Sequence, residues 1–219
     1  MHVNNKLKIG ITMQIVNARS YIEARDAIAH DWIYFFNQVF PDNKWVAIPN
    51  MGEWVIDYLK GWGLNCIIIS GGNDLGCEPV RDETEMCLLD HAIKNRIPVF
   101  GVCRGLQLLQ KYFGGKIERC PVDIHVAETH RVNINGYILP IKPVKKNITV
   151  NSYHEWGIKE GDLSKELDAF AISEDSYVEG VIGKNHRILA VQWHPERNNP
   201  VNDFDRKLID NVISKWSLV

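Results

Sequence analysis

The stretch Ile97–Gln107 constrains the fold of this chain more than any other. Its first part, Ile97–Val102, is continuously apolar, as expected of a parallel strand that is covered on both faces. From Leu106 onward the apolar residues follow helical spacing, so the chain changes from strand to helix within a few residues. Cys103 lies at this change, between two glycines that permit a sharp turn.

Cys103 has two interpretations. A helix N-terminus presents free backbone N–H groups and the positive end of the helix dipole, which favour a reactive thiolate. These N–H groups, beginning with that of Arg104, also face the place where an oxyanion would form. Most free cysteines, however, are small buried hydrophobic residues. This stretch alone leaves both interpretations open.

A second stretch, Leu189–Glu196, favours the catalytic interpretation. It is an apolar strand that ends in His194 and Glu196, and side chains two apart on an extended chain point the same way. A carboxylate that orients an imidazole, which in turn takes a proton from a thiol, is the logic of a catalytic triad. We therefore predict Cys103 as nucleophile, His194 as base and Glu196 as the group that orients it.

A third stretch supplies a glycine pair at a strand end. Ser70–Gly72 follows the apolar segment Cys66–Ile69, and such a turn can direct its backbone N–H groups toward a ligand. We predict that the N–H groups of Gly72 and Arg104 form an oxyanion hole. A plain tight turn is the alternative for the glycine pair.

Strands and helices alternate along the first half of the chain, which predicts an α/β fold with a doubly wound, mainly parallel sheet and helices on both faces. The expected strands are Leu7–Ile15, Trp45–Ile48, Cys66–Ile69 and Ile97–Val102. The first expected helix is Tyr21–Phe40, and the second is capped by Asn50 and Glu53 and places Trp54, Tyr58 and Trp62 in the core. The third is capped by Asp82 and Glu85 and runs to Asn95, and the fourth begins at Leu106 and ends at Gly114. We expect one domain, residues 1–219. Ligands bind such sheets at the carboxyl ends of the strands.

The second half of the chain shows a different pattern of expected elements. Residues 120–155 suggest irregular strands and loops, and a small antiparallel extension follows. Its expected strands are Ala169–Ser173, Tyr177–Ile182 and Arg187–Trp193, followed by a helix from Asp203 with Phe204, Leu208, Val212 and Trp216 on one face.

Composition excludes several classes of function. A formal charge of -2 gives no electrostatic footprint for nucleic acid or an anionic membrane, and no apolar run approaches the length of a membrane span. The five cysteines form an odd number without regular spacing, which favours a reducing cytoplasm over a disulfide scaffold. His125 and His130 could be argued as metal ligands, but the sequence places no further ligand beside them. We therefore expect no metal and no cofactor.

Several motifs together resemble one family. They are Gly101–Gln107, Ser70–Gly72, Trp193–Glu196, Arg81 with Asp82, Gly114 with Gly115, and Asn151–His154. The chain resembles the class I glutamine amidotransferases over about residues 7–200, and within them the peptidase C26 branch, the γ-glutamyl hydrolases. The resemblance implies a flavodoxin-like fold, a γ-glutamyl thioester on Cys103, and a Cys103–His194–Glu196 triad.

The resemblance also implies contacts with a small γ-glutamyl substrate. Gln107 is expected to hold the glutamyl part, since it lies one helical turn after Cys103 and leans back over the elbow. His154 is either a substrate contact or a partner of its own loop. Arginines could pair with an anionic leaving group or lie on the surface; the candidates are Arg19, Arg25, Arg81 and Arg131. Glu155 and Trp156 stand where the family often has His-Gln, so the leaving group is open.

A narrower resemblance concerns the γ-glutamyl-CDP-amidate hydrolases of bacterial capsule phosphoramidate biosynthesis, and it includes Glu23–Asp26 with Trp32. Two rival functions stay open. One is a glutaminase subunit that supplies ammonia to a partner synthase, and the other is an inactive binding module on the same fold. The sequence also leaves open whether the chain forms a homodimer.

Overall fold

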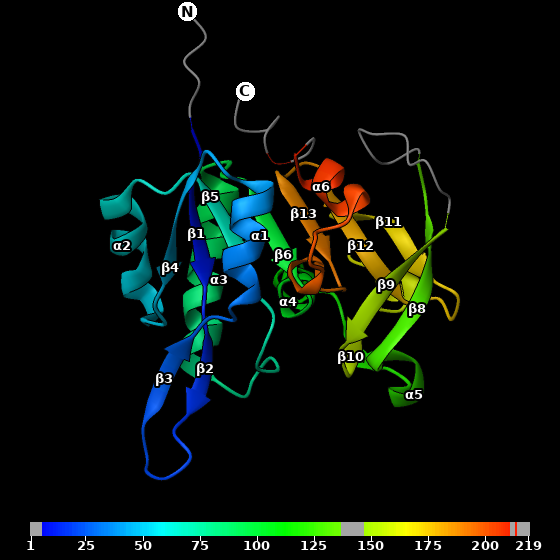
Figure 1. Cartoon of the computed structure of the whole chain (residues 1–219), viewed down its shortest axis with the longest axis horizontal. Helices are drawn as coiled ribbons and strands as arrows, with labels where there is room; N and C mark the ends of the chain where they lie inside the picture. The colour runs from blue at the N-terminus through cyan, green and yellow to red at the C-terminus, as the bar shows by residue number, and fades with distance from the viewer. Residues whose placement is uncertain (1–5, 137–146, 211–212, 214–219) are drawn as a thin grey trace, which may run out of the picture.

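The computed structural model describes residues 6–136, 147–210 and 213. Its centre is a nine-stranded mixed sheet in the order β4-β1-β5-β6-β13-β12-β11-β8-β9 (Figure 1). The parallel half contains β1 (Lys8–Thr12), β4 (Lys44–Ile48), β5 (Cys66–Ile69), β6 (Val99–Val102) and β13 (Ile188–Val191). The predicted α/β class with a mainly parallel, doubly wound sheet is confirmed.

The antiparallel half begins at β13. It adds β12 (Val178–Gly183), β11 (Leu167–Ser173), β8 (Val126–Ile134) and β9 (Asn147–Tyr153). Part of the region expected to be irregular therefore forms two long paired strands, β8 and β9. β7 (Glu118–Arg119) pairs with β10 (Trp156–Gly157) in a separate two-stranded sheet.

Helices cover both faces because the apolar residues of the parallel strands alternate between two cores. In β5, Ile68 packs into one core and Ile67 into the other. The first core is covered by α1 (Asp31–Val39) and α6 (Asp203–Ile209), and the second by α2 (Val55–Trp62), α3 (Pro79–Lys94) and α4 (Arg104–Tyr112). The short elements α5 (Val122–His125), η1 (Gly52–Trp54), η2 (Glu160–Asp162) and η3 (Pro195–Arg197) complete the chain.

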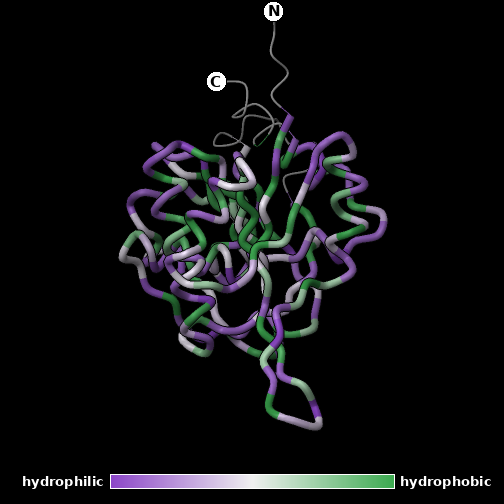
Figure 2. The backbone as a smooth tube through the Cα atoms, turned by 90° about the vertical axis from the view of Figure 1, so that its left-hand side faces the viewer, coloured by the Kyte–Doolittle hydropathy of each residue, from purple (hydrophilic) through white to green (hydrophobic). Residues whose placement is uncertain are grey.

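The expected helix Tyr21–Phe40 is wrong in its first half. β2 (Gln14–Asn17) and β3 (Ala24–Ala27) form a hairpin that protrudes from the body of the molecule (Figure 2), and only Asp31–Val39 is helical. Polar residues in β3 are exposed on both faces, so the segment lacks the apolar stripe that a packed helix requires.

Two predicted helix caps are also wrong. Asn50 donates its side-chain amide to Asp26 and to the carbonyl of Met13, and α2 begins later, after η1. α3 already begins at Pro79, which places Asp82 within the helix. Trp54 and Trp62, expected in the core, are 70% and 56% exposed.

Val212 and Trp216, expected on the last helix, lie outside the described residues. Among the described residues, no helix is long and apolar enough to cross a membrane.

Candidate active site

Cys103 lies at a sharp elbow between β6 and α4, as predicted. Its φ of 51° is in the left-handed region, which L-residues adopt only when the surrounding structure imposes it. Here the Cys103 N–H donates to Val191 of β13 at 2.8 Å, and its carbonyl accepts from Leu106 at 3.0 Å. Gly105 has no room for a side chain, because a Cβ there would lie 2.6 Å from the Ile69 carbonyl oxygen. The close packing of three segments thus fixes the sulfur at the carboxyl ends of the central parallel strands.

His194 and Glu196 lie next to each other just beyond β13. The Nδ1 atom of His194 lies 2.6 Å from Oε1 of Glu196, and both side chains are buried. Asn151 of β9 holds the backbone of His194 at two points: its Nδ2 donates to the His194 carbonyl at 2.9 Å, and its Oδ1 accepts the His194 N–H at 2.8 Å. The imidazole is therefore oriented by a carboxylate and fixed by a strand from the antiparallel half.

The imidazole also interacts with the sulfur of Cys103. Burial disfavours the charged ring, but the charges of Glu196 and Cys103 and hydrogen bonds to both raise the pKa of His194 to about 10. At neutral pH the ring is consequently an imidazolium. Such a cation beside a cysteine stabilises the thiolate form.

The Ser70–Gly72 turn packs directly against these two side chains. A Cβ at Gly71 would lie 2.7 Å from Cε1 of His194 and 3.6 Å from Cβ of Cys103, so only glycine fits. The carbonyl of Gly71 accepts a hydrogen bond from Arg81 at 2.9 Å. Because N–H and C=O of one trans peptide point in opposite directions, this bond turns the Gly72 N–H away from Arg81.

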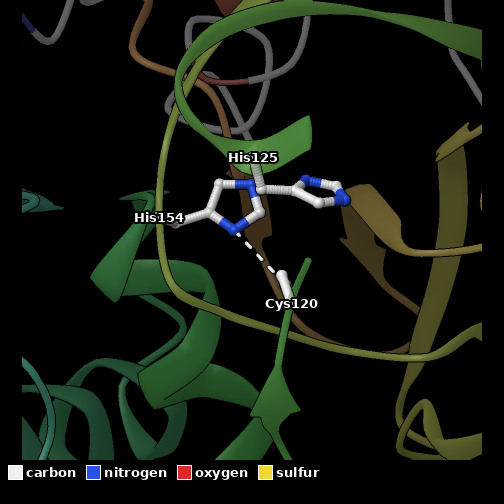
Figure 3. A group of neighbouring side chains, drawn as sticks. All are labelled: Cys120, His125 and His154. Carbon is white, nitrogen blue, oxygen red and sulfur yellow. Dashed lines mark hydrogen bonds between the residues drawn. The ribbon is translucent and has the colours of Figure 1, made fainter. Parts of the chain in front are cut away.

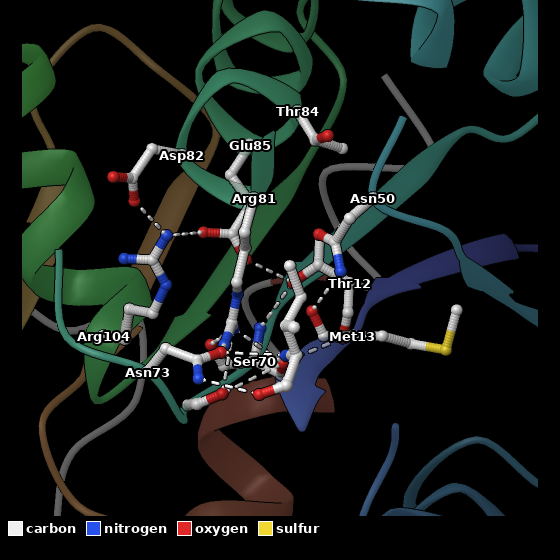
Figure 4. A network of polar contacts seen from close by, with 12 residues as sticks. Thr12, Met13, Asn50, Ser70, Asn73, Arg81, Asp82, Thr84, Glu85 and Arg104 are labelled. Atoms are coloured by element: carbon white, nitrogen blue, oxygen red, sulfur yellow. Dashed lines mark hydrogen bonds and ion pairs between the residues drawn. The ribbon is translucent and has the colours of Figure 1, made fainter. Parts of the chain in front are cut away.

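Arg81 does not occupy the place expected of a substrate contact. It is fully buried behind the turn, where its guanidinium donates to Ser70, Gly71, Asn73 and Glu85 (Figure 4). These contacts leave it no surface for a leaving group.

Arg25 is exposed on the β2–β3 hairpin, where it pairs with Glu23 and Tyr21. It does not line the cavity beside His194, and it is not brought together with the other predicted site residues.

Gln107 lies one turn after Cys103, as predicted, but its amide donates to the carbonyl of Trp156 at 2.8 Å. A second glutamine, which the sequence analysis missed, shares this carbonyl. Gln192 is fully buried, and its Nε2 lies 3.3 Å from Trp156 O and 3.9 Å from the Cys103 sulfur. Its place directly after β13 and two residues before His194 was the available signal.

His154 is buried next to the Trp156 carbonyl and does not line the cavity beside His194. Its Nδ1 lies 3.1 Å from the carbonyl of Trp156, two residues along, which corresponds to the local alternative for this histidine. Its other nitrogen faces Glu179 at 3.6 Å. In the described part of the chain, possible metal-binding groups are formed by Cys120 with His125 and His154, and by His125 with His130 and Glu179.

A cavity of about 250 Å³ opens beside His194. The Gly turn, η3, the end of β3 and the start of α1 enclose it, through residues that include Gln14, Asp31, Trp32, Gly72, Glu196 and Arg197. The guanidinium of Arg197 lies 4.1 Å over the ring of Tyr153, which fixes its direction. The cavity therefore offers an arginine that the sequence analysis did not name.

Comparison with known proteins gives a family match. The model of the peptidase C26 family matches residues 69–196. The γ-glutamyl-CDP-amidate hydrolase of Campylobacter jejuni is 29% identical over 214 residues, which cover 95% of this chain and 96% of the relative. The γ-glutamyl-γ-aminobutyrate hydrolase PuuD of Escherichia coli K12 is 33% identical over 196 residues, which cover 81% of this chain and 73% of the relative.

Solved structures show the same fold at lower identity. A glutamine amidotransferase from Thermotoga maritima superposes with a TM-score of 0.63 at 13% identity, covering 98% of this chain and 96% of that one. A protein from Thermoplasma acidophilum, described as belonging to a GMP synthase, gives a TM-score of 0.72 at 20% identity, covering 97% and 95%.

Proposed function

Since this chain belongs to the peptidase C26 family and is a hydrolase of γ-glutamyl amide bonds, we propose that it works through a γ-glutamyl thioester on Cys103. The observation that supports this most is the meeting of two distant segments. Cys103 after β6 and His194 beyond β13 lie at the carboxyl ends of two neighbouring parallel strands, although they are 91 residues apart in sequence. Glu196 lies beside His194.

In the first half-reaction, the Cys103 thiolate attacks the γ-carbonyl carbon. The carbonyl π electrons move to oxygen, and the backbone N–H groups of Gly72 and Arg104 stabilise that oxyanion. The carbon–nitrogen bond then breaks, and the leaving nitrogen takes the proton of the His194 imidazolium. Arg81 contributes by holding the Gly71 carbonyl, which orients the Gly72 N–H.

In the second half-reaction, neutral His194 takes a proton from water, and the hydroxide attacks the thioester carbon. The carbon–sulfur bond breaks, which releases glutamate and restores the thiolate beside the imidazolium. Glu196 stabilises the positive ring in both halves through the bond to Nδ1. Gln192, 3.9 Å from the sulfur, and Gln107, which shares the Trp156 carbonyl with it, are positioning groups for the glutamyl part.

For the leaving group we propose the nucleoside diphosphoramidate of γ-glutamyl-CDP-amidate, in bacterial capsule modification. The relative from Campylobacter jejuni matches almost end to end, whereas the γ-aminobutyrate hydrolase matches over a smaller share of both chains. Arg197 faces the cavity beside His194, where a guanidinium can pair with phosphate oxygens.

A substrate panel tests both levels of the proposal. Glutamate release is measured with γ-glutamyl-CDP-amidate, γ-glutamyl-γ-aminobutyrate and glutamine at equal concentrations. The proposal predicts the highest kcat/KM for the CDP-amidate. A preference for glutamine that increases with a partner would indicate a glutaminase subunit, and no glutamate release from any of the three would indicate an inactive module.

Two cysteine variants separate the mechanism from the substrate. Cys103→Ala is expected to lower kcat by at least about 10⁴-fold while the fold persists. Cys77→Ser is the matched control, because Cys77 is an exposed free cysteine, and it should keep the parent rate. Turnover by the alanine variant at the parent rate would refute the covalent mechanism.

A further inference from the structure

A cluster of buried titratable side chains lies in the antiparallel half, apart from the proposed triad. We call it the Glu179 cluster, and its members are His125 of α5, His130 of β8, His154 after β9 and Glu179 of β12. Three members are at most 3% exposed, and only His130 is partly exposed. Figure 3 shows two of its histidines with the neighbouring Cys120.

The members direct unpartnered atoms at one another. Both carboxylate oxygens of Glu179, Nδ1 of His125 and Nε2 of His154 are buried without a hydrogen bond. Oε1 of Glu179 lies 3.8 Å from the first of these nitrogens and 3.6 Å from the second. Its other oxygen lies 3.4 Å from Nε2 of His130. These separations are too long for good hydrogen bonds.

From this geometry we propose that the Glu179 cluster binds one zinc ion. Zinc prefers four ligands in a tetrahedron, and imidazole nitrogens and carboxylate oxygens are among its usual donors. Bonds of about 2.0–2.1 Å place neighbouring donor atoms roughly 3.3 Å apart. The donor atoms of His125, His130 and Glu179 lie within 4.8 Å of one another, and Nε2 of His154 lies 3.6 Å from Oε1 of Glu179. Closing these side chains around one ion requires the rings to move by about an ångström.

Groups around the cluster hold two of the rings as ligands. Nε2 of His125 lies 2.9 Å from Oδ2 of Asp175, so a proton on Nε2 leaves Nδ1 free for the metal. The Nδ1 of His154 lies 3.1 Å from the carbonyl of Trp156, which in the same way leaves Nε2 free. Hydrogen bonds of this kind, to a carboxylate or a backbone carbonyl, orient histidine ligands in metal sites.

The cluster combines one carboxylate with three imidazoles, a donor set that binds a divalent cation when the rings are neutral. Without an ion, an ion pair between His130 and Glu179 is the ordinary alternative.

Cys120 is excluded from this ligand set. Its sulfur lies 3.7 Å from Nδ1 of His154, the nitrogen on the side of the ring that faces Trp156. We therefore expect the sulfur to pack beside the site without binding the ion.

The proposed zinc site would hold the Trp156 carbonyl in place beside the catalytic centre. His154 contacts the Trp156 carbonyl, which also accepts from Gln107 and Gln192, and the latter reaches the Cys103 sulfur. The ion is therefore structural and takes no part in the reaction.

Metal analysis tests the proposal without using activity. The protein is prepared without a histidine tag in the Cys103→Ala background, which removes the proposed catalytic thiol as a competing ligand. After dialysis in metal-free buffer we expect about one zinc ion per chain by elemental mass spectrometry, and under about a tenth of that in the Glu179→Gln variant. Cys120→Ser is the control and should keep its zinc; loss of the ion there would overturn the ligand set.

A second measurement covers the case in which the glutamine variant does not fold. The Cys103→Ala protein is stripped with a chelator and titrated with Co²⁺, which reports a tetrahedral site by intense visible absorption. We expect these bands, a higher Tm on binding, and displacement by zinc. A stripped protein with an unchanged Tm and no bands would overturn the proposal and leave the hydrolase proposal untouched.

Discussion

Glu85 and Glu179 are both fully buried, yet their surroundings differ. Glu85 of α3 lies 3.0 Å from Nε of Arg81 and 2.9 Å from Nη2 of Arg104, and it accepts from the Thr12 hydroxyl at 2.8 Å (Figure 4). Around Glu179 the described ionisable partners are histidines at 3.4–3.8 Å. One carboxylate is balanced by permanent cations and the other by groups whose charge depends on pH or on a metal.

This difference teaches how each half supports the proposed catalytic elbow. The two arginines around Glu85 hold the Gly turn and the first turn of α4 in place, and their guanidinium charges are permanent. The Glu179 cluster contacts the Trp156 carbonyl through His154, and in our proposal a bound zinc ion balances its charge. The two halves should therefore respond differently to substitution, chelation and pH.

The largest effect is expected at Glu85. Glu85→Gln removes the charge that faces two buried arginines, and breaking a buried ion pair from one side costs about 3–5 kcal/mol of unfolding free energy. Urea unfolding measures it, and a chelator should leave the loss unchanged. A loss below about 1 kcal/mol would mean that the arginines are balanced by other groups.

Glu179→Gln should behave differently. With zinc at a thousandfold above Kd, the wild type gains about 4 kcal/mol that the variant lacks. In chelator the loss should shrink to that of the histidine contacts alone, whose separations of 3.4–3.8 Å are too long for good hydrogen bonds. The same comparison by urea unfolding, with and without chelator, checks this; equal losses in both conditions would contradict the comparison.

Asn151 links the antiparallel half to the proposed triad. Asn151→Ala removes both hydrogen bonds to the His194 backbone, and displacement of a catalytic group by about 1 Å costs on the order of 10²-fold in rate. We expect kcat to fall with KM changed less. Steady-state kinetics on the best γ-glutamyl substrate measure this, and an unchanged kcat would show that Glu196 alone positions the ring.

Glu196 is an intermediate case between Glu85 and Glu179. Its negative charge is balanced by the His194 imidazole, which can lose its proton. The pKa of His194 in the folded chain is about 10, above its value of 6.5 in an unfolded chain. The stabilisation is therefore complete below pH 6.5 and is lost as the pH rises through 10. Unfolding free energies between pH 6 and 10 should decline in the wild type and be flatter in Glu196→Gln; parallel profiles would refute the pairing.

The smallest effect is expected at Arg25, which pairs on the exposed hairpin. Arg25→Ala should change stability by less than about 0.5 kcal/mol, since exposed ion pairs contribute little. It should leave KM for γ-glutamyl-CDP-amidate unchanged, whereas Arg197→Ala raises that KM but not the KM for glutamine. A larger effect of Arg25→Ala on KM would indicate that the β2–β3 hairpin contacts the substrate.

The sequence predicted those parts whose signal is local. Cys66–Ile69 was placed to the residue because a strand buried on both faces is continuously apolar. The elbow at Cys103 and the His194–Glu196 spacing were equally visible, since each is contained in a few residues. The fold class followed from the alternation of such segments.

What the sequence did not show depends on contacts between distant residues. Asp82 and Glu85 looked like helix caps, but they are partners of Arg104, about twenty positions away. Of the Glu179 cluster, only His125 and His130 lie close enough in sequence to suggest a site together; His154 and Glu179 come from distant segments, so no spacing predicted the complete set.

The central claim is a covalent γ-glutamyl intermediate on Cys103, and acid quenching during turnover tests it most directly. Peptide mass spectrometry of the quenched protein should find the γ-glutamyl group on the Cys103 peptide, lost on treatment with hydroxylamine, and absent from Cys103→Ala. Turnover with no acyl group on Cys103, or with the group on another residue, would contradict the account.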